Sequence, residues 1–261
     1  MSSLITCSPK FLPPDRSESA ANKAVDIALA MLPPNYQFYQ TTGGEDKPPQ
    51  ELAVVKKFRW PFKAVRLTVG FLDNPPTDLQ ERILSHMNAW AKSADVQFTL
   101  SNTDSLVRIA RWNTPPEWAG YWSLVGTDIL GIAADMPTMN LQGFTMNTPE
   151  SEFLRVVRHE TGHTLGFPHE HMRQALVDKI DPLKANAYYW ENCEWLPDTV
   201  RDQVLKPIEN GSIRGTAYAD PNSIMCYQIP GKITKDGIPI PGGSDISDLD
   251  YEFAASIYPK K

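Results

Sequence analysis

The sequence predicts an α+β fold, because its helix and strand candidates are grouped along the chain rather than alternating. A helix comes first, followed by a strand, a second helix, a run of short strands and a helix that carries two of the five histidines. Hydrophobic residues make up 41% and charged residues 21% of the chain, which is ordinary for a globular protein and argues against disorder or a coiled coil.

The N-terminal part predicts one helix and a linker. Residues 18–32 combine strong helix formers with apolar residues at helical spacing, which is typical of an amphipathic helix. Residues 33–49 contain four prolines and a glycine pair, which indicate a linker. We therefore divide the chain into an N-terminal extension, residues 1–55, and a main domain, residues 56–261.

The main domain begins with alternating and helical patterns. Between residues 64 and 71 apolar and polar side chains alternate, which predicts a half-buried strand. Thr77 is the expected N-cap of a helix that runs to Ala91 with one apolar face. Short strands are predicted at 96–100, 106–112, 128–133 and 138–144.

The second half of the domain holds two further helix signals. One helix is expected to begin near Thr148, which can cap it and precedes a proline suited to the first helical position. After Gly166 prolines punctuate the sequence, and we predict irregular structure. A last helix is expected to start at Ser247, with Asp250 as its capping-box partner, and to end near Tyr258.

The decisive motif is H-E-T-G-H-T-L-G-F-P-H, at positions 159–169. On a helix, His159 and His163 share one face about 6 Å apart along the axis, so both imidazoles can reach one Zn²⁺ ion. Glu160 projects beside them, where its carboxylate can take a proton from metal-bound water without being a ligand.

The third histidine requires a turn in the chain. A continuous helix would put His169 about 15 Å along the axis from His159, too far to share an ion. Gly166 can end the helix in a left-handed conformation, and Pro168 prevents it from resuming. Three histidines leave one coordination position open, which is the pattern of a catalytic rather than a structural site. The sequence therefore predicts one catalytic zinc ion.

The motif resembles that of the metzincin clan of zinc endopeptidases. Glu170, directly after the third histidine, makes it similar to the astacin family. Residues 223–227, S-I-M-C-Y, resemble the astacin Met-turn, and residues 122–126, W-S-L-V-G, resemble the edge strand above the astacin cleft. Astacins typically pair four cysteines and this chain has three, so it looks like a disulfide-poor microbial relative.

The resemblance implies a metzincin-like catalytic domain. Such a domain has a twisted mixed β-sheet with a backing helix and an active-site helix, above an irregular C-terminal subdomain that ends in a helix. The upper lobe would comprise residues 59–166 and the lower lobe residues 167–261, with an extended substrate in the cleft between them.

The resemblance also implies roles for residues outside the zinc motif. Tyr227 would ligate zinc at rest and swing to stabilise the oxyanion, and Met225 would pack beneath the three histidines. Glu170 would anchor a buried contact and needs a donor that the sequence does not identify. Backbone groups of the edge strand would pair with substrate, although an ordinary strand with a buried tryptophan explains the pattern too; these residues are Trp122, Ser123 and Leu124.

The N-terminal extension has two interpretations, a removable inhibitory prosegment or a permanent part of the fold. The F-x-G-D pattern by which astacin prosegments supply an aspartate to zinc is absent. A thiolate at Cys7 would be another way to block the metal, but residues 5–9 show no supporting pattern, and we assign Cys7 no role.

Together these features predict a zinc-dependent endopeptidase, with a catalytically inactive, zinc-stabilised binding protein as the alternative. The expected partner is a protein or peptide substrate, and the chain is expected to be a monomer. The net charge of −6 argues against nucleic acid, and no apolar run is long enough for membrane insertion. The first residues lack the pattern of a classical signal peptide, so we expect a cytoplasmic protein or export by a leader-independent route.

Overall fold

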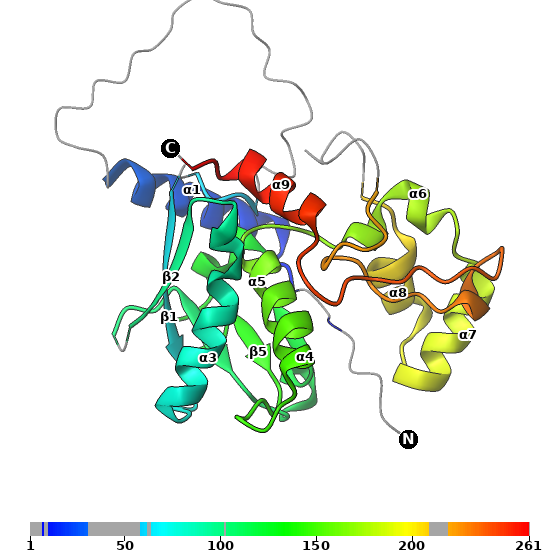
Figure 1. Ribbon diagram of the computed structural model, residues 1–261, viewed down its shortest axis with the longest axis horizontal. Coiled ribbons are helices and arrows are strands. Elements are labelled where there is room, and N and C mark those ends of the chain that lie inside the picture. Colours follow the sequence, from blue (N-terminus) through cyan, green and yellow to red (C-terminus); the bar gives the residue numbers. More distant parts are fainter. Residues whose placement is uncertain are drawn as a thin grey trace, which may run out of the picture.

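A computed structural model of the chain describes residues 7, 10–30, 58–61, 64–101, 103–208 and 219–260. The linker predicted at 33–49 lies outside these residues. Figure 1 shows a twisted sheet with helices packed against it, beside a second group of helices formed by the C-terminal half of the chain. The predicted α+β class is confirmed.

Five strands form one mixed sheet in the order β2-β1-β3-β5-β4. The strands are β1 (Val65–Phe71), β2 (Val96–Leu100), β3 (Val107–Ala110), β4 (Tyr121–Ser123) and β5 (Met139–Leu141). The first four strands in the sheet order pair in parallel, whereas β4 runs antiparallel to β5 and lies at the edge. In β1 the side chains of Val65, Leu67 and Val69 are buried, as their alternation predicts.

Two long helical segments cover the sheet and carry the site (Figure 1). Helix α3 (Thr77–Met87) is continued by a 3₁₀ turn, η2 (Asn88–Lys92). The second segment is helical without a break and consists of α4 (Glu150–Glu152), a π-helical stretch η5 (Phe153–Val157) and α5 (Arg158–Thr164). Both segments pack with the sheet into one hydrophobic core. The first two histidines of the motif 159–169 therefore lie on a buried, rigid helix.

Three local predictions were wrong in detail. Residues 128–133 do not form a strand, because a 3₁₀ turn, η4 (Gly126–Gly131), follows β4 and turns the buried Asp128 side chain towards the N-terminal helix. Thr77 is the first helical residue of α3 rather than its cap, and Pro76 occupies the N-cap position. Pro149 likewise caps α4, while the Thr148 hydroxyl accepts a hydrogen bond from Thr145 N.

The region after Gly166 is more helical than predicted. It contains η6 (Glu170–Met172), α6 (Gln174–Val177), α7 (Pro182–Cys193), α8 (Pro197–Val200), η7 (Arg201–Leu205) and η9 (Gly231–Ile233). Helix α7 starts with a side-chain cap, since the Asp181 carboxylate accepts from the amides of Leu183 and Lys184. Two of the prolines that suggested irregular structure, Pro182 and Pro197, begin helices α7 and α8 instead.

The last helix, α9 (Asp248–Ile257), has the predicted capping box between Ser247 and Asp250. Its buried residues join the core of the sheet, and the hydroxyl of Tyr258 donates to the Leu165 carbonyl at 2.7 Å. Helices α7 and α8 instead contribute the apolar side chains of one face to a second core, among them Ala185, Tyr189 and Val200. The chain thus forms two packed regions, with the end of α5 between them.

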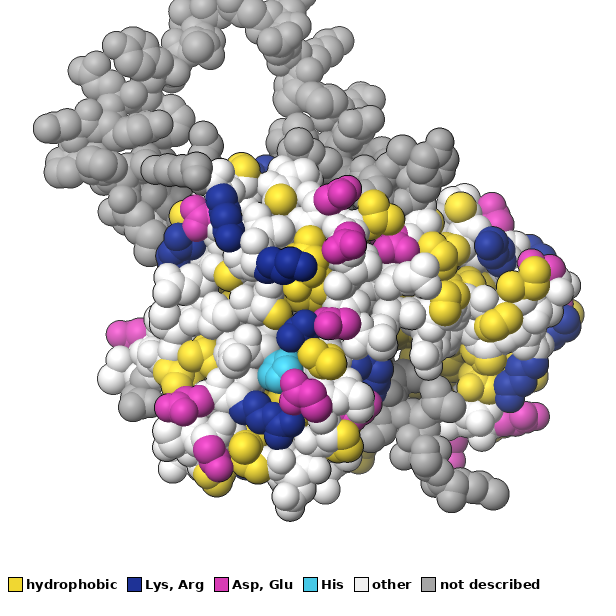
Figure 2. Space-filling model, viewed as in Figure 1, with side chains coloured by type: hydrophobic (Ala, Val, Ile, Leu, Met, Phe, Trp, Pro, Cys, Tyr) yellow, Lys and Arg dark blue, Asp and Glu magenta, His cyan; other side chains and the backbone are white. Residues whose placement is uncertain are grey.

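The N-terminal helix, α1 (Pro14–Ala30), begins four residues before the predicted start and packs against η4. On the face of the molecule in Figure 2, acidic and basic side chains lie interspersed rather than gathered by sign. Among the described residues, no helix combines the length and apolar character that crossing a bilayer requires.

Candidate metal centre

The helix η5–α5 places the first two histidines of the motif one turn apart. The side chains of His159 and His163 are 7% and 0% exposed, and their ring centroids lie 4.8 Å apart. Gly162, between them, fits closely against Met225, because a Cβ at this position would lie 2.4 Å from the Met225 Sδ atom. The motif therefore needs its glycine for packing as well as its histidines for chemistry.

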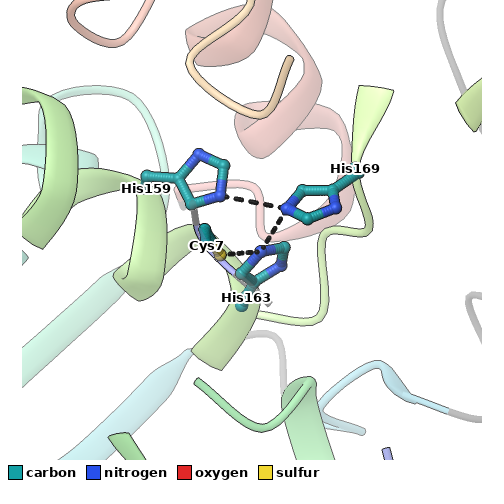
Figure 3. Close-up of side chains that lie close together, drawn as sticks. All are labelled: Cys7, His159, His163 and His169. Carbon is teal, nitrogen blue, oxygen red and sulfur yellow. Dashed lines mark hydrogen bonds between the residues drawn. The ribbon is translucent and has the colours of Figure 1, made fainter. Parts of the chain in front are cut away.

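The chain reverses after α5 at Gly166, which adopts a φ of +95°. A side chain there would also approach the Phe58 carbonyl oxygen at 2.9 Å, so both conformation and space favour glycine. The turn carries His169 back to the helix, where its Nε2 atom lies 3.2 Å from that of His159 and 3.1 Å from that of His163 (Figure 3). The three predicted ligands converge.

Hydrogen bonds at the opposite ring nitrogens fix the tautomers of two histidines. The Nδ1 atom of His159 contacts the Ile224 carbonyl at 2.5 Å, and that of His163 contacts the Phe167 carbonyl at 2.7 Å. A carbonyl oxygen only accepts, so both Nδ1 atoms carry the proton and both Nε2 atoms present a lone pair. Two lone pairs therefore face the single Nε2 atom of His169, which can donate to only one of them.

A cation satisfies this arrangement where hydrogen bonds cannot. Ligands held about 2.0–2.1 Å from a tetrahedral zinc ion lie about 3.3–3.4 Å apart, close to the observed nitrogen separations. Burial lowers the pKa of His159 to about 4 and holds the pKa values of His163 and His169 well below their ordinary range. All three rings are therefore neutral and able to bind a metal at neutral pH.

A fourth donor comes from the N-terminus. The Cys7 Sγ atom lies 3.5 Å from the His163 Nε2 atom, and the thiol and the three ring nitrogens all lie within 4.8 Å of one another (Figure 3). One sulfur and one nitrogen ligand of a tetrahedral zinc ion are about 3.5 Å apart, so the Cys7–His163 separation suits two ligands of one ion. The sequence contained a cysteine here, but no local pattern that connected it with a histidine 156 residues away.

Glu160 lies beside the cluster with its carboxylate buried. Neither of its carboxylate oxygens has a hydrogen-bond partner within the described ranges of the chain. Burial raises the pKa of Glu160 to about 8, and burial followed by the charge of Glu160 raises the pKa of the Cys7 thiol. A divalent cation in the cluster would lower the pKa of both groups, because its positive charge stabilises the Glu160 carboxylate and the Cys7 thiolate.

Tyr227 and His171 form a stacked pair next to the third histidine. Their rings are 4.2 Å apart at 17°, and the Tyr227 ring lies 4.3 Å from that of His169. His171 is held by the Gln203 carbonyl at 2.9 Å on one nitrogen and by the Tyr227 amide at 3.4 Å on the other, which makes it structural. The Tyr227 hydroxyl is buried and finds no hydrogen-bond partner in the part of the chain that is described.

The loop 223–225 links the metal centre to the capping box of α9. Asp250 accepts from the Ser223 hydroxyl at 2.6 Å and from the Ile224 amide at 2.9 Å. The same loop supplies the Ile224 carbonyl that orients His159, and it places Met225 against the motif helix. A residue recognised in the sequence as a helix cap therefore also positions a histidine.

Glu170 finds its donors within the protein. Its Oε1 atom accepts from the Arg173 guanidinium and from the Asp220 amide, both at 3.1 Å. Burial raises the pKa of Glu170 in spite of these two donors. The buried contact expected from the sequence is thus made to Arg173 and to the segment before the loop 223–225.

The edge strand β4 lies beside α5 and pairs with the N-terminal segment. Trp122 and Ser123 are 1% and 0% exposed, and the Ser123 hydroxyl lies 3.1 Å from that of Thr164 in α5. The Lys10 amide donates to the Ser123 carbonyl at 3.0 Å, and Lys10 forms a parallel bridge with Leu124. The residues expected to contact substrate therefore lie at the edge of the sheet, where Lys10 pairs with Ser123 and Leu124. Their contact with substrate stays a prediction.

Comparison with other proteins gives structural relatives. No family model matches the chain, and no curated protein matches it. Two structures of myroilysin are similar: one has 28% identity over 79% of this chain and 98% of that chain at a TM-score of 0.72, the other 30% identity over 78% and 86% at 0.56. A hatching enzyme zinc-protease from the medaka fish, Oryzias latipes, shares the fold at 15% identity, covering 78% of this chain and 94% of that chain at 0.51.

Proposed function

The chain belongs to the metzincin-clan zinc metallopeptidases, with an astacin-like catalytic domain, and on that premise we propose that it is an endopeptidase in which Glu160 activates the attacking water. One observation carries the proposal: the Nε2 atoms of three histidines meet at a point beside a buried carboxylate that makes no geometric hydrogen bond in the described residues. A structural zinc site needs no such carboxylate, whereas hydrolysis does.

His159, His163 and His169 would hold the zinc ion, which supplies a Lewis acid that polarises the scissile carbonyl and acidifies water. Glu160 accepts the proton of the attacking water and passes it to the leaving amine. The neighbouring group that interacts with this carboxylate is the Cys7 thiol, which would leave together with the N-terminal segment and free the carboxylate for this exchange.

Tyr227 is the candidate for oxyanion stabilisation. Its hydroxyl is buried near His169 and uncommitted within the described residues, so it can donate to a negative oxygen that forms at the cluster. Met225, Gly166 and Glu170 support the site: Met225 packs under the motif, Gly166 turns the chain and Glu170 ties the third histidine's segment to Asp220.

The N-terminal extension closes the site in the full chain. Cys7 would be the fourth zinc ligand, and Lys10 occupies the backbone groups of β4 that an extended peptide would use. A substrate therefore competes with this segment both at the metal and at the edge strand. We assign residues 1–55 the role of a prosegment that must leave the cleft before a peptide can enter.

Cleavage of a proteome-derived peptide library tests the proposal. The full chain carrying Cys7→Ala should cut internal peptide bonds, lose this activity in a chelator and regain it when zinc is returned. The zinc content should be one ion per chain. A protein that holds one zinc ion per chain and cuts no peptide in the library would instead be the inactive, zinc-stabilised binding protein.

A further inference from the structure

The side chain of Lys10 lies between two tryptophans at the edge of the sheet. Its ammonium nitrogen is 4.2 Å from the ring centroid of Trp122 in β4 and 4.5 Å from that of Trp118 in η3 (Pro116–Trp118). Both distances are well within the roughly 6 Å at which a cation is attracted to an aromatic face. We call Trp118 and Trp122 the tryptophan pair.

The tryptophan pair is held in place by the fold rather than by Lys10. The Trp122 indole nitrogen donates to the Trp118 carbonyl at 3.0 Å, and the two rings are 5.4 Å apart at an angle of 52°. Trp122 is 1% exposed and Trp118 is half-buried. The cation site therefore exists independently of the side chain that fills it.

The backbone pairing fixes where this site lies relative to the metal. Cys7 bridges to Tyr121 and Lys10 bridges to Leu124, both in parallel, so the register advances by three residues on each chain. Cys7 stands at the three histidines and Lys10 at the tryptophan pair. An extended chain advances about 3.3 Å per residue, which puts the cation site about 10 Å along the strand from the metal.

We propose that the tryptophan pair is a substrate subsite for a lysine or arginine side chain, three residues from the scissile bond. This inference rests on the proposed function and adds a specificity to it. A peptide that pairs with β4 passes over the same surface as Cys7 and Lys10, so its side chain at the position of Lys10 meets the same two indoles. Aromatic faces attract a cation and repel a carboxylate, so acidic side chains are selected against at this position.

Two substitutions in the full-length chain make the metal position and the tryptophan pair available to a substrate. In the variant Cys7→Ala, Lys10→Ala neither the metal position nor the tryptophan pair is filled by the chain's own side chains. The substrates are two sets of peptides, in which lysine, norleucine or glutamate stands three residues before or three residues after the cleaved bond. The set whose cleavage depends on this residue shows which side of the bond meets the tryptophan pair. Lysine should exceed norleucine in kcat/KM by about 2- to 30-fold, the range that cation–π interactions span, with glutamate below both.

Trp118→Leu in this background should bring the lysine-to-norleucine ratio close to one. Trp190→Leu is the matched control, because Trp190 is an exposed tryptophan on α7, and it should keep the ratio. A ratio near one before substitution, or one that Trp118→Leu leaves unchanged, would overturn the subsite.

A failure to cut any peptide would count against the proposed function and would leave the subsite untested by cleavage. A second measurement therefore tests the subsite without using activity. Iodoacetamide labels Cys7 in the zinc-loaded full chain when the N-terminal segment lifts, and peptide mapping by mass spectrometry separates it from Cys193 and Cys226. Lys10→Met should speed this labelling by about 2- to 30-fold, and Lys10→Arg should leave it nearly unchanged. Equal rates for Met and Arg would show that the tryptophan pair does not select a cation and would overturn the inference.

Discussion

The two sides of the metal centre are held in different ways. On one side, His159, His163 and His169 fall within eleven consecutive residues and are at most 7% exposed. They come from a helix buried in the main core and from the turn that follows it. On the other side, Cys7 and Lys10 come from a distant segment that reaches the site over an edge strand. The first side belongs to the core and the second is attached to its surface.

Polar contacts account for much of that attachment. The buried Asp128 carboxylate accepts from the Leu12 amide at 2.9 Å and from the Ser17 hydroxyl at 2.6 Å. Helix α1 adds mainly small apolar side chains, Ala20 and Ala24, to the main core. In the proposed function, the histidine side carries the chemistry and the N-terminal side controls access to it.

The largest effect is expected at the histidine side. In the Cys7→Ala background, Glu160→Gln removes the proton acceptor but none of the three nitrogen donors, so turnover should fall by about 10²–10⁴-fold while zinc content stays the same. Peptide cleavage rates and metal analysis on the same preparation measure both. Glu191→Gln, at an exposed acid on α7, is the control and should change neither. A Glu160→Gln protein with a rate near that of the parent would rule out the assigned role.

Packing beneath the histidines gives the next largest effect. Gly162→Ala places a methyl group 2.4 Å from the Met225 Sδ atom, and overpacking of this kind costs about 1–3 kcal/mol of unfolding free energy. Urea unfolding measures the loss. In a Met225→Ala background the same substitution should cost clearly less, because the clashing atoms are gone. Equal costs in the two backgrounds would mean that Gly162 is not limited by Met225.

A smaller effect is expected at the N-terminal side. Ser17→Ala leaves one oxygen of the buried Asp128 carboxylate without its hydroxyl donor, which should cost about 1–2 kcal/mol and speed amide exchange in α1 and labelling of Cys7. Ser19→Ala is matched in chemistry and lies exposed on the same helix. If both variants exchange and label alike, Asp128 does not secure the segment.

The smallest predicted effect concerns pH and lies away from the cleft. His86 in α3 is 7% exposed, and burial lowers its pKa although Glu150 lies 3.3 Å away and opposes the shift. Below about pH 6.5 His86 is protonated in the unfolded chain, whereas the native state binds this proton more weakly. Protonation therefore favours the unfolded chain, and the free energy of unfolding falls as the pH falls. His86→Gln should therefore reduce the pH dependence of the unfolding free energy between pH 7 and 5. An unchanged slope in urea titrations would contradict this.

Several features of the fold and site were predictable because they depend on neighbouring residues. The capping box at Ser247 and Asp250, the alternation of β1 and the reversal at Gly166 are all set by residues within a few positions of one another. The turn at 128–133 was missed for the opposite reason. Its apolar residues suit a strand, but the partner that decides its conformation is the N-terminal helix more than one hundred residues earlier.

The sequence by itself determined the three histidines, the glutamate beside them and the glycine that brings them together, because helical spacing and one turn suffice to aim these side chains at a point. Only the tertiary structure decided that Cys7 lies beside the three histidines and that Lys10 lies against two indoles. Those contacts join residues more than one hundred positions apart. Their geometry follows from how the N-terminal segment pairs with the edge strand and packs on η4, which no local pattern encodes.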